Sequence, residues 1–324
     1  MREAILASEI KDDEKEMRQA FCQSMIALAE ENKDVVLLDA DLMSAMGTKP
    51  FAKRFPERTV DCGVQEANMI GVACGLAVQG KIPFAHTFGS FATRRACDQV
   101  FLSGAYNKAN VKIIGSDPGV TAAYNGGTHM PFEDMGIMRG IPTMTVIEPT
   151  DNVMLSYLIP LISAAYGIFY MRLVRKGVKK VYEEGSEFEI GKAVKLRDGK
   201  DATIVASGFC VPEALSAAQI LAEQGINVRV LDMFTWKPID EKAIVSAASE
   251  TGAIVTAENH NIINGLGSAV AEVLATTEYA PLVRVGVEDE FGEVGPISYL
   301  RKRFGLTDEK IVDSVKEAIA RKNS

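Results

Sequence analysis

Short apolar segments alternate with longer amphipathic segments along the whole chain. A short apolar run bounded by turn residues predicts a strand buried on both faces, and apolar residues at a spacing of three or four predict a helix. Strands that alternate with helices are typical of parallel sheets covered on both sides, so we predict an α/β fold with two doubly wound domains. The strands predicted in the first half are residues 35–41, 83–88, 111–117, 144–149 and 168–173.

A charged stretch with glycines, RKGVKKVYEEGSEFEIGK, interrupts this alternation after residue 174. Glycine and charge together are typical of a connecting segment. We therefore predict a first domain of residues 1–178 and a second domain of residues 190–324. The alternation resumes in the second domain, with strands predicted in 202–208, 227–234 and 253–259 and helices in 211–225, 240–252 and 265–275.

Composition narrows the class of protein. The chain has 324 residues, 47% hydrophobic and 24% charged, and a formal net charge of −8. Its Lys and Arg residues are scattered, which argues against nucleic acid or an anionic membrane as a partner. The first residues, MREAILASEIKDDEKEMR, are too charged for a signal peptide, and no apolar run approaches the roughly 18 residues that span a bilayer. We expect a cytoplasmic protein.

The five cysteines are an odd number and contain no CxxC pair, so we expect neither a disulfide framework nor a zinc site. No metal-ligand spacing is found elsewhere in the sequence. Loops that follow parallel strands are the places to look for chemistry, because open α/β sheets bind ligands at the carboxyl ends of their strands.

Three stretches carry candidate residues. Glu66 in DCGVQEANM begins a helix, where a carboxylate also complements the helix dipole. Phe88 and Phe91 lie in the turn of HTFGSF, where aromatic rings either complete the core or stack on a flat ligand. His129 in NGGTHMPFED is a loop histidine, which is either merely exposed or able to bind substrate. A fourth stretch, ENHNIINGLGS, lacks the residues of a phosphate-binding turn.

The order of these motifs resembles the second half of a transketolase. GVQEANM is followed by HTFGSF, then by GGTHMPFEDMGIMRGIPTMTVIEPTD and finally by ENHNIINGLGSAVAEVL. The resemblance covers nearly the whole chain and implies a pyrimidine-binding domain followed by a transketolase C-terminal domain. The GDG motif of the diphosphate-binding domain is not found in the sequence. The resemblance therefore implies a separate N-terminal diphosphate-binding subunit, and we expect a heterotetramer with two chains of each kind.

The resemblance also implies a cofactor and roles for particular residues. The cofactor is thiamine diphosphate with Mg²⁺, the metal being held mainly by the partner subunit. Glu66 would hydrogen-bond the aminopyrimidine ring and help to activate the cofactor. The other expected cofactor-binding residues are Phe88, Phe91 and Asp41.

The expected substrates are sugar phosphates. The resemblance implies that His129 contacts the ketose donor, and that Arg18 and Arg172 bind a sugar phosphate, a task that suits a guanidinium. The chain departs from the family at Asn125, where transketolases usually have an aspartate that helps select the sugar. An amide cannot accept hydrogen bonds with a carboxylate's charge, so Asn125 is expected to alter the substrate preference.

The resemblance implies that the chain is a subunit of a transketolase that moves a two-carbon ketol unit from a ketose phosphate to an aldose phosphate. One alternative is the beta subunit of a thiamine-dependent 2-oxo acid dehydrogenase, which has the same two domains. A second alternative is a non-catalytic scaffold subunit. Glu66, Phe91 and His129 argue against the scaffold, because a subunit without turnover has no need of them.

Overall fold

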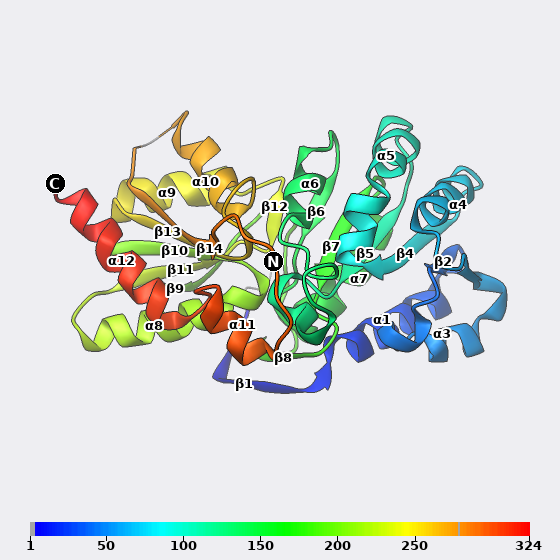
Figure 1. Ribbon diagram of the computed structural model, residues 1–324, viewed down its shortest axis with the longest axis horizontal. Helices are drawn as coiled ribbons and strands as arrows, with labels where there is room; N and C mark the ends of the chain where they lie inside the picture. The colour runs from blue at the N-terminus through cyan, green and yellow to red at the C-terminus, as the bar shows by residue number, and fades with distance from the viewer. Residues whose placement is uncertain (1–3, 278) are drawn as a thin grey trace.

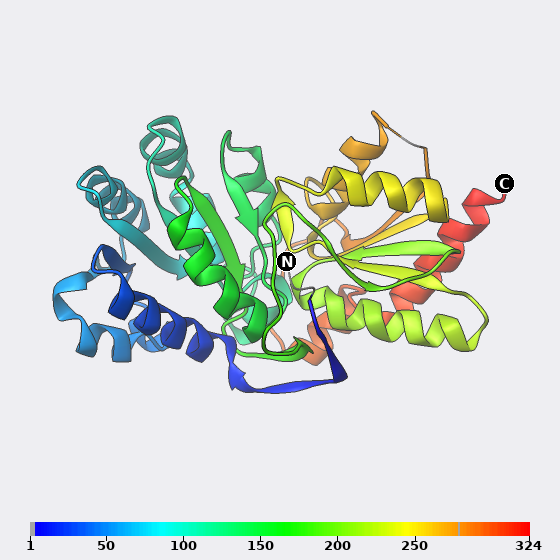
Figure 2. The ribbon, with the colours of Figure 1, turned by 180° about the vertical axis from the view of Figure 1, so that it is seen from behind.

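The computed structural model describes residues 4–277 and 279–324. It contains two α/β units that lie side by side, with the C-terminal helix at the outer end of the second unit (Figure 1). The reverse view shows helices covering the back of both sheets as well as the front (Figure 2). The predicted α/β class with doubly wound domains is confirmed.

The sheet of the first unit has the strand order β12-β6-β7-β5-β4-β2-β3. Its neighbouring strands are parallel except at β12, which pairs antiparallel with β6. The predicted apolar runs all form strands of this sheet. The bounds are β2 (Val35–Asp39), β3 (Thr59–Asp61), β4 (Ile82–Phe88), β5 (Lys112–Ser116), β6 (Thr145–Ile147), β7 (Phe169–Leu173) and β12 (Thr235–Lys237).

Alternate residues of each strand pack on opposite faces of this sheet. Leu37 of β2 joins a core cluster with helices α1 and α7, and Leu38 joins a second cluster with α4. Both faces are thus buried, which explains why the strands have continuous apolar sequences. The helices and helical turns of this unit are α1 (Met17–Glu31), α2 (Met43–Met46), α3 (Lys49–Arg54), η1 (Pro56–Arg58), α4 (Glu66–Val78), η2 (Phe91–Arg95), α5 (Cys97–Gln99), η3 (Val100–Tyr106), η4 (Gly119–Asn125), α6 (Asp134–Gly140) and α7 (Asn152–Ala164).

The second sheet has the order β14-β13-β10-β11-β9, with only β9 antiparallel to its neighbour. Helices α8 and α12 cover one face, and α9 and α10 cover the other. The elements are β9 (Val194–Arg197), β10 (Ala202–Ala206), η5 (Gly208–Cys210), α8 (Val211–Glu223), β11 (Val228–Asp232), α9 (Glu241–Thr251), β13 (Ile254–Asn261), α10 (Leu266–Leu274), β14 (Leu282–Val287), α11 (Ile297–Arg303) and α12 (Asp308–Lys322).

Two pairings were not predicted. β1 (Leu6–Glu16) pairs antiparallel with β8 (Gly177–Tyr182), so part of the charged connecting stretch is a strand. β12 follows β11 in the sequence but adds to the edge of the first sheet. Both involve short or highly charged segments whose partners are remote in the sequence, so local patterns carry no sign of them.

In the described part of the chain, no helix is long and apolar enough to cross a membrane.

Candidate active site

Glu66 begins α4 and faces inward. It lies on the same helical face as Met69, Ile70 and Ala73, which are all completely buried. Because residues three, four and seven positions apart share one face of a helix, this apolar stripe draws the first turn of α4 against the sheet. The side chain of Glu66 is only 2% exposed as a result.

Three aromatic rings meet beside the carboxyl end of β4. Phe88 ends this strand, and Phe91 opens the π-helical turn η2 that follows. Their ring centroids are 6.0 Å apart, and His129 lies 5.6 Å from Phe88 and 5.0 Å from Phe91. All three pairs are edge-to-face, the geometry that aromatic quadrupoles favour. The structure therefore brings together two predicted cofactor residues and the predicted substrate histidine.

Arg95 joins Glu66 to this aromatic cluster. Its Nη1 donates to both carboxylate oxygens of Glu66, at 2.9 and 2.8 Å. Its guanidinium carbon lies 3.9 Å from the centroid of the Phe91 ring. A flat, hydrogen-bond-donating group thus stacks on an aromatic face and binds a buried carboxylate at the same time. Sequence reasoning missed this arginine.

His129 lies in a long loop between β5 and α6 and is partly buried. Its Nδ1 lies 2.9 Å from the hydroxyl of Thr128, and the carbonyl of Thr128 accepts a hydrogen bond from Arg94 at 3.0 Å. Arg94 also pairs with Glu133, at 3.0 Å. These contacts anchor the loop on both sides of the histidine, which leaves the ring directed at the two phenylalanines.

Two family models match this chain. The model described as "Transketolase, pyrimidine binding domain" matches residues 13–179, and the model described as "Transketolase, C-terminal domain" matches residues 191–311. The chain belongs to the transketolase family. The resemblance found in the sequence motifs is therefore confirmed.

Some relatives of this transketolase-family chain match it over nearly their whole length. It is 52% identical over 315 residues to a 6-deoxy-6-sulfo-D-fructose transketolase subunit (SqwH) of Clostridium sp., covering 97% of this chain and 98% of the relative. It is 36% identical to a subunit of the apulose-4-phosphate transketolase of Phocaeicola vulgatus, covering 93% and 97%. A solved structure titled "Split gene transketolase, inactive beta4 tetramer" matches with a TM-score of 0.87 and 42% identity, covering 94% and 98%.

The structure does not place Arg172 in the site of this transketolase subunit. Arg172 is completely buried in β7, and its guanidinium donates to Asp134 and Glu148. It also donates to the backbone oxygens of Pro131 and Asn259. Burial raises the pKa of Glu148, and Arg172 acts against this shift. A guanidinium with these partners has no surface for a sugar phosphate, so we leave Arg172 out of the proposed substrate site.

Arg175, three residues later, does reach the aromatic cluster. Its guanidinium carbon lies 5.5 Å from the Phe88 centroid, and its Nε donates to Asp117 at 3.0 Å. Burial raises the pKa of Asp117 overall, although Arg175 favours the charged carboxylate. The sequence could have indicated Arg175 as a site residue, because it is the first arginine beyond the end of a predicted strand.

The remaining predicted residues lie on other segments of the first unit. Asn125 is exposed at the end of η4, in the loop that leads to His129. Asp41 is exposed after β2, and its amide donates to Asp61 at 3.0 Å. Arg18 pairs with Glu16 at 2.6 Å and donates to the Ala45 carbonyl at 2.8 Å. Their roles stay predictions.

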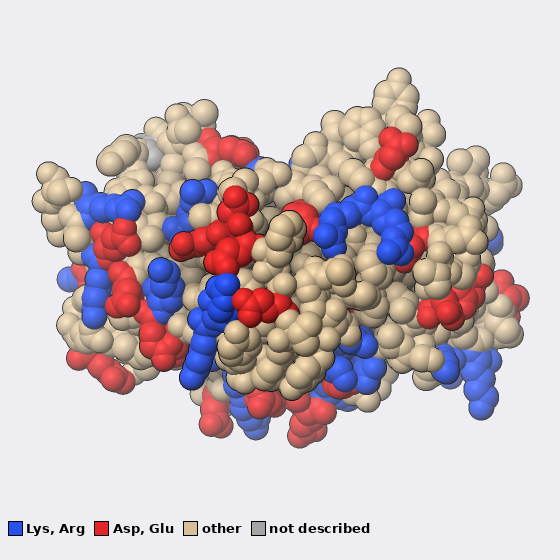
Figure 3. All heavy atoms as spheres, viewed as in Figure 1, with Lys and Arg blue, Asp and Glu red and all other residues tan. Residues whose placement is uncertain are grey.

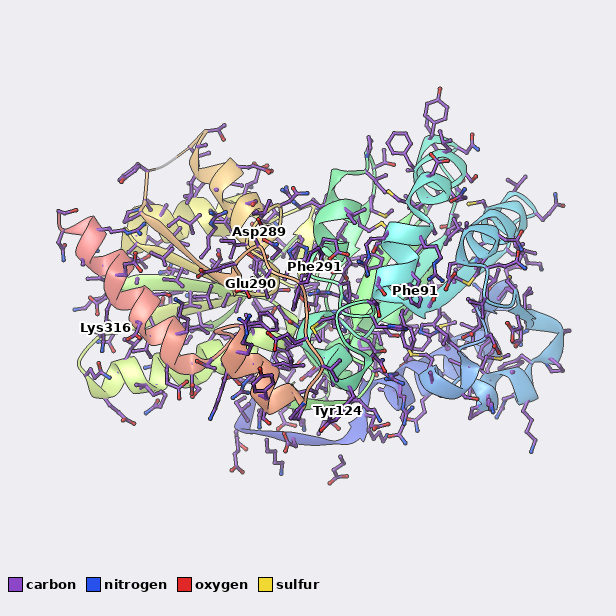
Figure 4. The ribbon with its side chains drawn as sticks, in the orientation of Figure 1. Phe91, Tyr124, Asp289, Glu290, Phe291 and Lys316 are labelled. Carbon is purple, nitrogen blue, oxygen red and sulfur yellow. The ribbon has the colours of Figure 1, made fainter. Side chains whose placement is uncertain are left out.

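The C-terminal domain forms one wall beside the loop of His129. A pocket there is lined by Arg94, Gly127 and Glu133 from the first domain and by Asp289, Glu290 and Phe291 from the second. Figure 4 shows the last three near the middle of the molecule, with Phe91 on the neighbouring first unit. Acidic side chains gather over the same region, beside a basic group (Figure 3).

Among residues 4–277 and 279–324, no group of three or more His, Cys, Asp or Glu is placed to hold a metal ion.

Proposed function

We propose that this chain, together with a diphosphate-binding subunit, is a thiamine diphosphate-dependent transketolase that moves a two-carbon ketol unit from a ketose phosphate to an aldose phosphate. The observation that carries the proposal is that Arg95 joins the buried carboxylate of Glu66 to the ring of Phe91, which in turn lies against the imidazole of His129. Family membership and the named activities of the relatives support the same reaction class.

The residues of this chain fit the aminopyrimidine half of the cofactor. The guanidinium of Arg95 stacks on Phe91 and hydrogen-bonds to Glu66, so the same space suits another flat ring that carries hydrogen-bond donors. Glu66 would hold a ring nitrogen, and Phe91 would fix the plane of the ring. When bound, thiamine diphosphate supplies the carbon nucleophile that the side chains of a protein lack.

His129 and Arg175 are proposed to receive the donor sugar. His129 stands next to the ring of Phe91 and carries a nitrogen that can bind or move a proton at a sugar oxygen. Arg175 lies beside Phe88 and suits the anionic end of the sugar, because a guanidinium binds phosphate or sulfonate oxygens in pairs. Asn125, Arg18 and Asp41 remain proposed substrate or cofactor residues.

The diphosphate and Mg²⁺ are proposed to bind mainly on the partner subunit, in a heterotetramer of two chains of each kind. The two matching family models are those of the pyrimidine-binding and C-terminal domains. Two relatives of matching length are named as subunits, which supports the need for a partner.

The test is a reconstitution. The chain is combined with a candidate diphosphate-binding subunit, thiamine diphosphate and Mg²⁺, and is assayed against a panel of ketose donors and aldose phosphate acceptors. The panel includes 6-deoxy-6-sulfo-D-fructose, because a relative is named for that substrate. Glu66→Gln keeps the shape of the side chain but not its charge, and we expect it to lower kcat by about a hundredfold or more.

Glu213→Gln is the matched control. Glu213 is also a buried glutamate paired with an arginine, Arg301, but it lies in α8 of the second domain. Absence of ketol transfer across the panel, or full turnover by Glu66→Gln, contradicts the proposal. Decarboxylation of 2-oxo acids by the complex would instead support the dehydrogenase alternative.

A further inference from the structure

The loop of residues 118–132 carries both Asn125 and His129, and its two ends are tied together. The amide of Gly119 donates to the carbonyl of Pro131 at 3.1 Å, which closes the loop at its base. The amide of Asn261, at the end of β13 in the second domain, donates to the carbonyl of Phe132 at 2.8 Å. The base of this loop therefore rests on the carboxyl end of β13.

Asn259, also in β13, holds the start of the same loop with its side chain. Its Oδ1 accepts from the amide of Val120 at 3.0 Å, and its Nδ2 donates to the carbonyl of Pro118 at 3.0 Å. Its backbone oxygen accepts from Arg172 at 2.9 Å, and the residue is completely buried. Both polar atoms of the side-chain amide are thus used to fix two backbone groups of the loop.

The loop that Asn259 contacts has residues with positive φ angles. Gly119 has φ +47°, and a Cβ atom there would lie 2.1 Å from Oδ1 of Asn259. Ala123, further along the loop, has φ 49° and ψ −117°, which a residue with a side chain seldom adopts. A strained segment persists only where its surroundings hold it. The buried amide of Asn259 holds the start of this segment, at Pro118 and Val120.

The second domain also supports the far side of the loop. A Cβ atom on Gly127 would lie 2.5 Å from the carbonyl oxygen of Gly292, and one on Gly126 would lie 2.7 Å from Val294. The loop is thus held between β13 and the 288–295 segment. By contrast, Glu66 and Phe91 belong to α4 and η2 of the first domain.

We propose that Asn259 is a positioning residue for ketol transfer, which fixes the 118–132 loop so that His129 and Asn125 meet the donor sugar in a productive geometry. The inference rests on the proposed function and assigns a task to the ENHN segment of the C-terminal domain. Asn259 acts through the loop and does not itself contact the reacting atoms. Its loss should affect the donor and leave the affinity for the cofactor unchanged.

The test uses Asn259→Ala in the reconstituted complex with its partner subunit. We expect kcat/KM for the ketose donor to fall about ten- to a hundredfold, because small misplacements of positioning groups have costs of this size. The dissociation constant for thiamine diphosphate, measured by calorimetry, should stay within about twofold of the wild-type value. Amide hydrogen exchange should rise at Val120 and along the loop, and stay unchanged in β4 and α4.

A second variant reaches the same contact from the loop. Gly119→Ala drives a methyl group into Oδ1 of Asn259 and should give the same kinetic pattern. Two controls match these variants. Gly225→Ala changes a glycine with φ +81° and open space around it. Asn152→Ala removes a buried asparagine whose side-chain amide donates to the backbone carbonyl of Lys15 in the N-terminal strand.

The outcomes separate the two proposals. Unchanged exchange of the loop in Asn259→Ala and Gly119→Ala overturns the positioning role, whether or not the complex turns over. Increased exchange with unchanged kcat/KM for the donor overturns it as well. If Asn259→Ala does not fold, Gly119→Ala decides by the same two measurements. Failure of the wild-type complex to transfer ketol units overturns the proposed function instead.

Discussion

The Nη1 atom of Arg95 donates to both carboxylate oxygens of Glu66, at 2.9 and 2.8 Å. The same guanidinium lies 3.9 Å from the centre of the Phe91 ring. Arg95 thereby contacts the same carboxylate and the same aromatic face to which the proposed cofactor ring would bind. About half of its side chain, 46%, is exposed, so the arginine can swing toward solvent while Glu66 stays buried.

Removing Arg95 should therefore strengthen cofactor binding. We expect Arg95→Ala to lower the dissociation constant for thiamine diphosphate by about twofold to fivefold, since a partly exposed ion pair contributes at most about 1 kcal/mol. Calorimetric titration of the complex measures this. Arg94→Ala is the control, because Arg94 pairs with Glu133. Weaker binding by Arg95→Ala would mean that Arg95 holds the cofactor and does not compete with it.

The two phenylalanines should differ in their contributions. Phe91→Leu removes the ring on which a flat group stacks, and we expect cofactor affinity to fall about tenfold. Phe88 is only 8% exposed and meets Phe91 edge-on, so Phe88→Leu should mainly lower the melting temperature. Titration and thermal unfolding of both variants separate the effects. Equal losses of affinity would place both rings directly against the cofactor.

Arg172 should be a determinant of stability. Arg172→Met leaves the buried carboxylates of Asp134 and Glu148 without their cation. We expect the free energy of unfolding to fall by about 3–5 kcal/mol, the usual cost of breaking a buried ion pair. Urea unfolding measures the loss. Arg229→Met is the control, because the partners of Arg229, Asp198 and Glu250, are exposed. A similar small loss in both variants would contradict the structural role of Arg172.

Stability should depend on pH through Asp232. This residue is completely buried, and burial raises its pKa to about 7. Its Oδ2 accepts from Thr150 at 2.6 Å and from Tyr182 at 2.7 Å. An unfolded aspartate has a pKa of about 3.9, so between that value and pH 7 the folded chain binds the proton more tightly. The free energy of unfolding therefore falls as the pH rises through this window.

Asp232→Asn is neutral at every pH and should lack this fall. Relative to wild type, we expect the variant to gain stability between pH 4 and pH 8, by up to a few kcal/mol. Urea unfolding at several pH values, followed by tryptophan fluorescence, measures the gain. Asp313→Asn, a change of an exposed aspartate in α12, is the control. A constant difference between Asp232→Asn and wild type would show that Asp232 does not titrate in this window.

The strands were predicted correctly where a continuous apolar run reflects burial on both faces of a sheet. Residues 35–38 are all apolar because both faces of β2 are covered, so their sequence directly indicates burial. The pattern of β1 is charged and mostly exposed, and its partner β8 lies far along the chain. No local pattern specifies such a pair.

Some residues of the candidate site could likewise be predicted from the sequence, and others could not. The order of the motifs predicted Glu66, Phe91 and His129 as site residues, and their roles stay predictions. It misjudged Arg172, because an arginine in a strand has the same local pattern whether it faces a substrate or two buried carboxylates. Only packing brought Asp134 and Glu148 to that guanidinium and turned Arg175 toward Phe88.

The sequence by itself determined the fold class and the family and proposed Glu66, Phe91 and His129 as site residues, since these inferences depend on local periodicity and on motifs in a fixed order. Tertiary structure alone decided that Arg95 covers Glu66 and that Asn259 holds the loop of His129. The reason is physical. Hydrogen bonds between residues 29 and 139 positions apart depend on how the elements pack, and neither partner carries a local sign of the other.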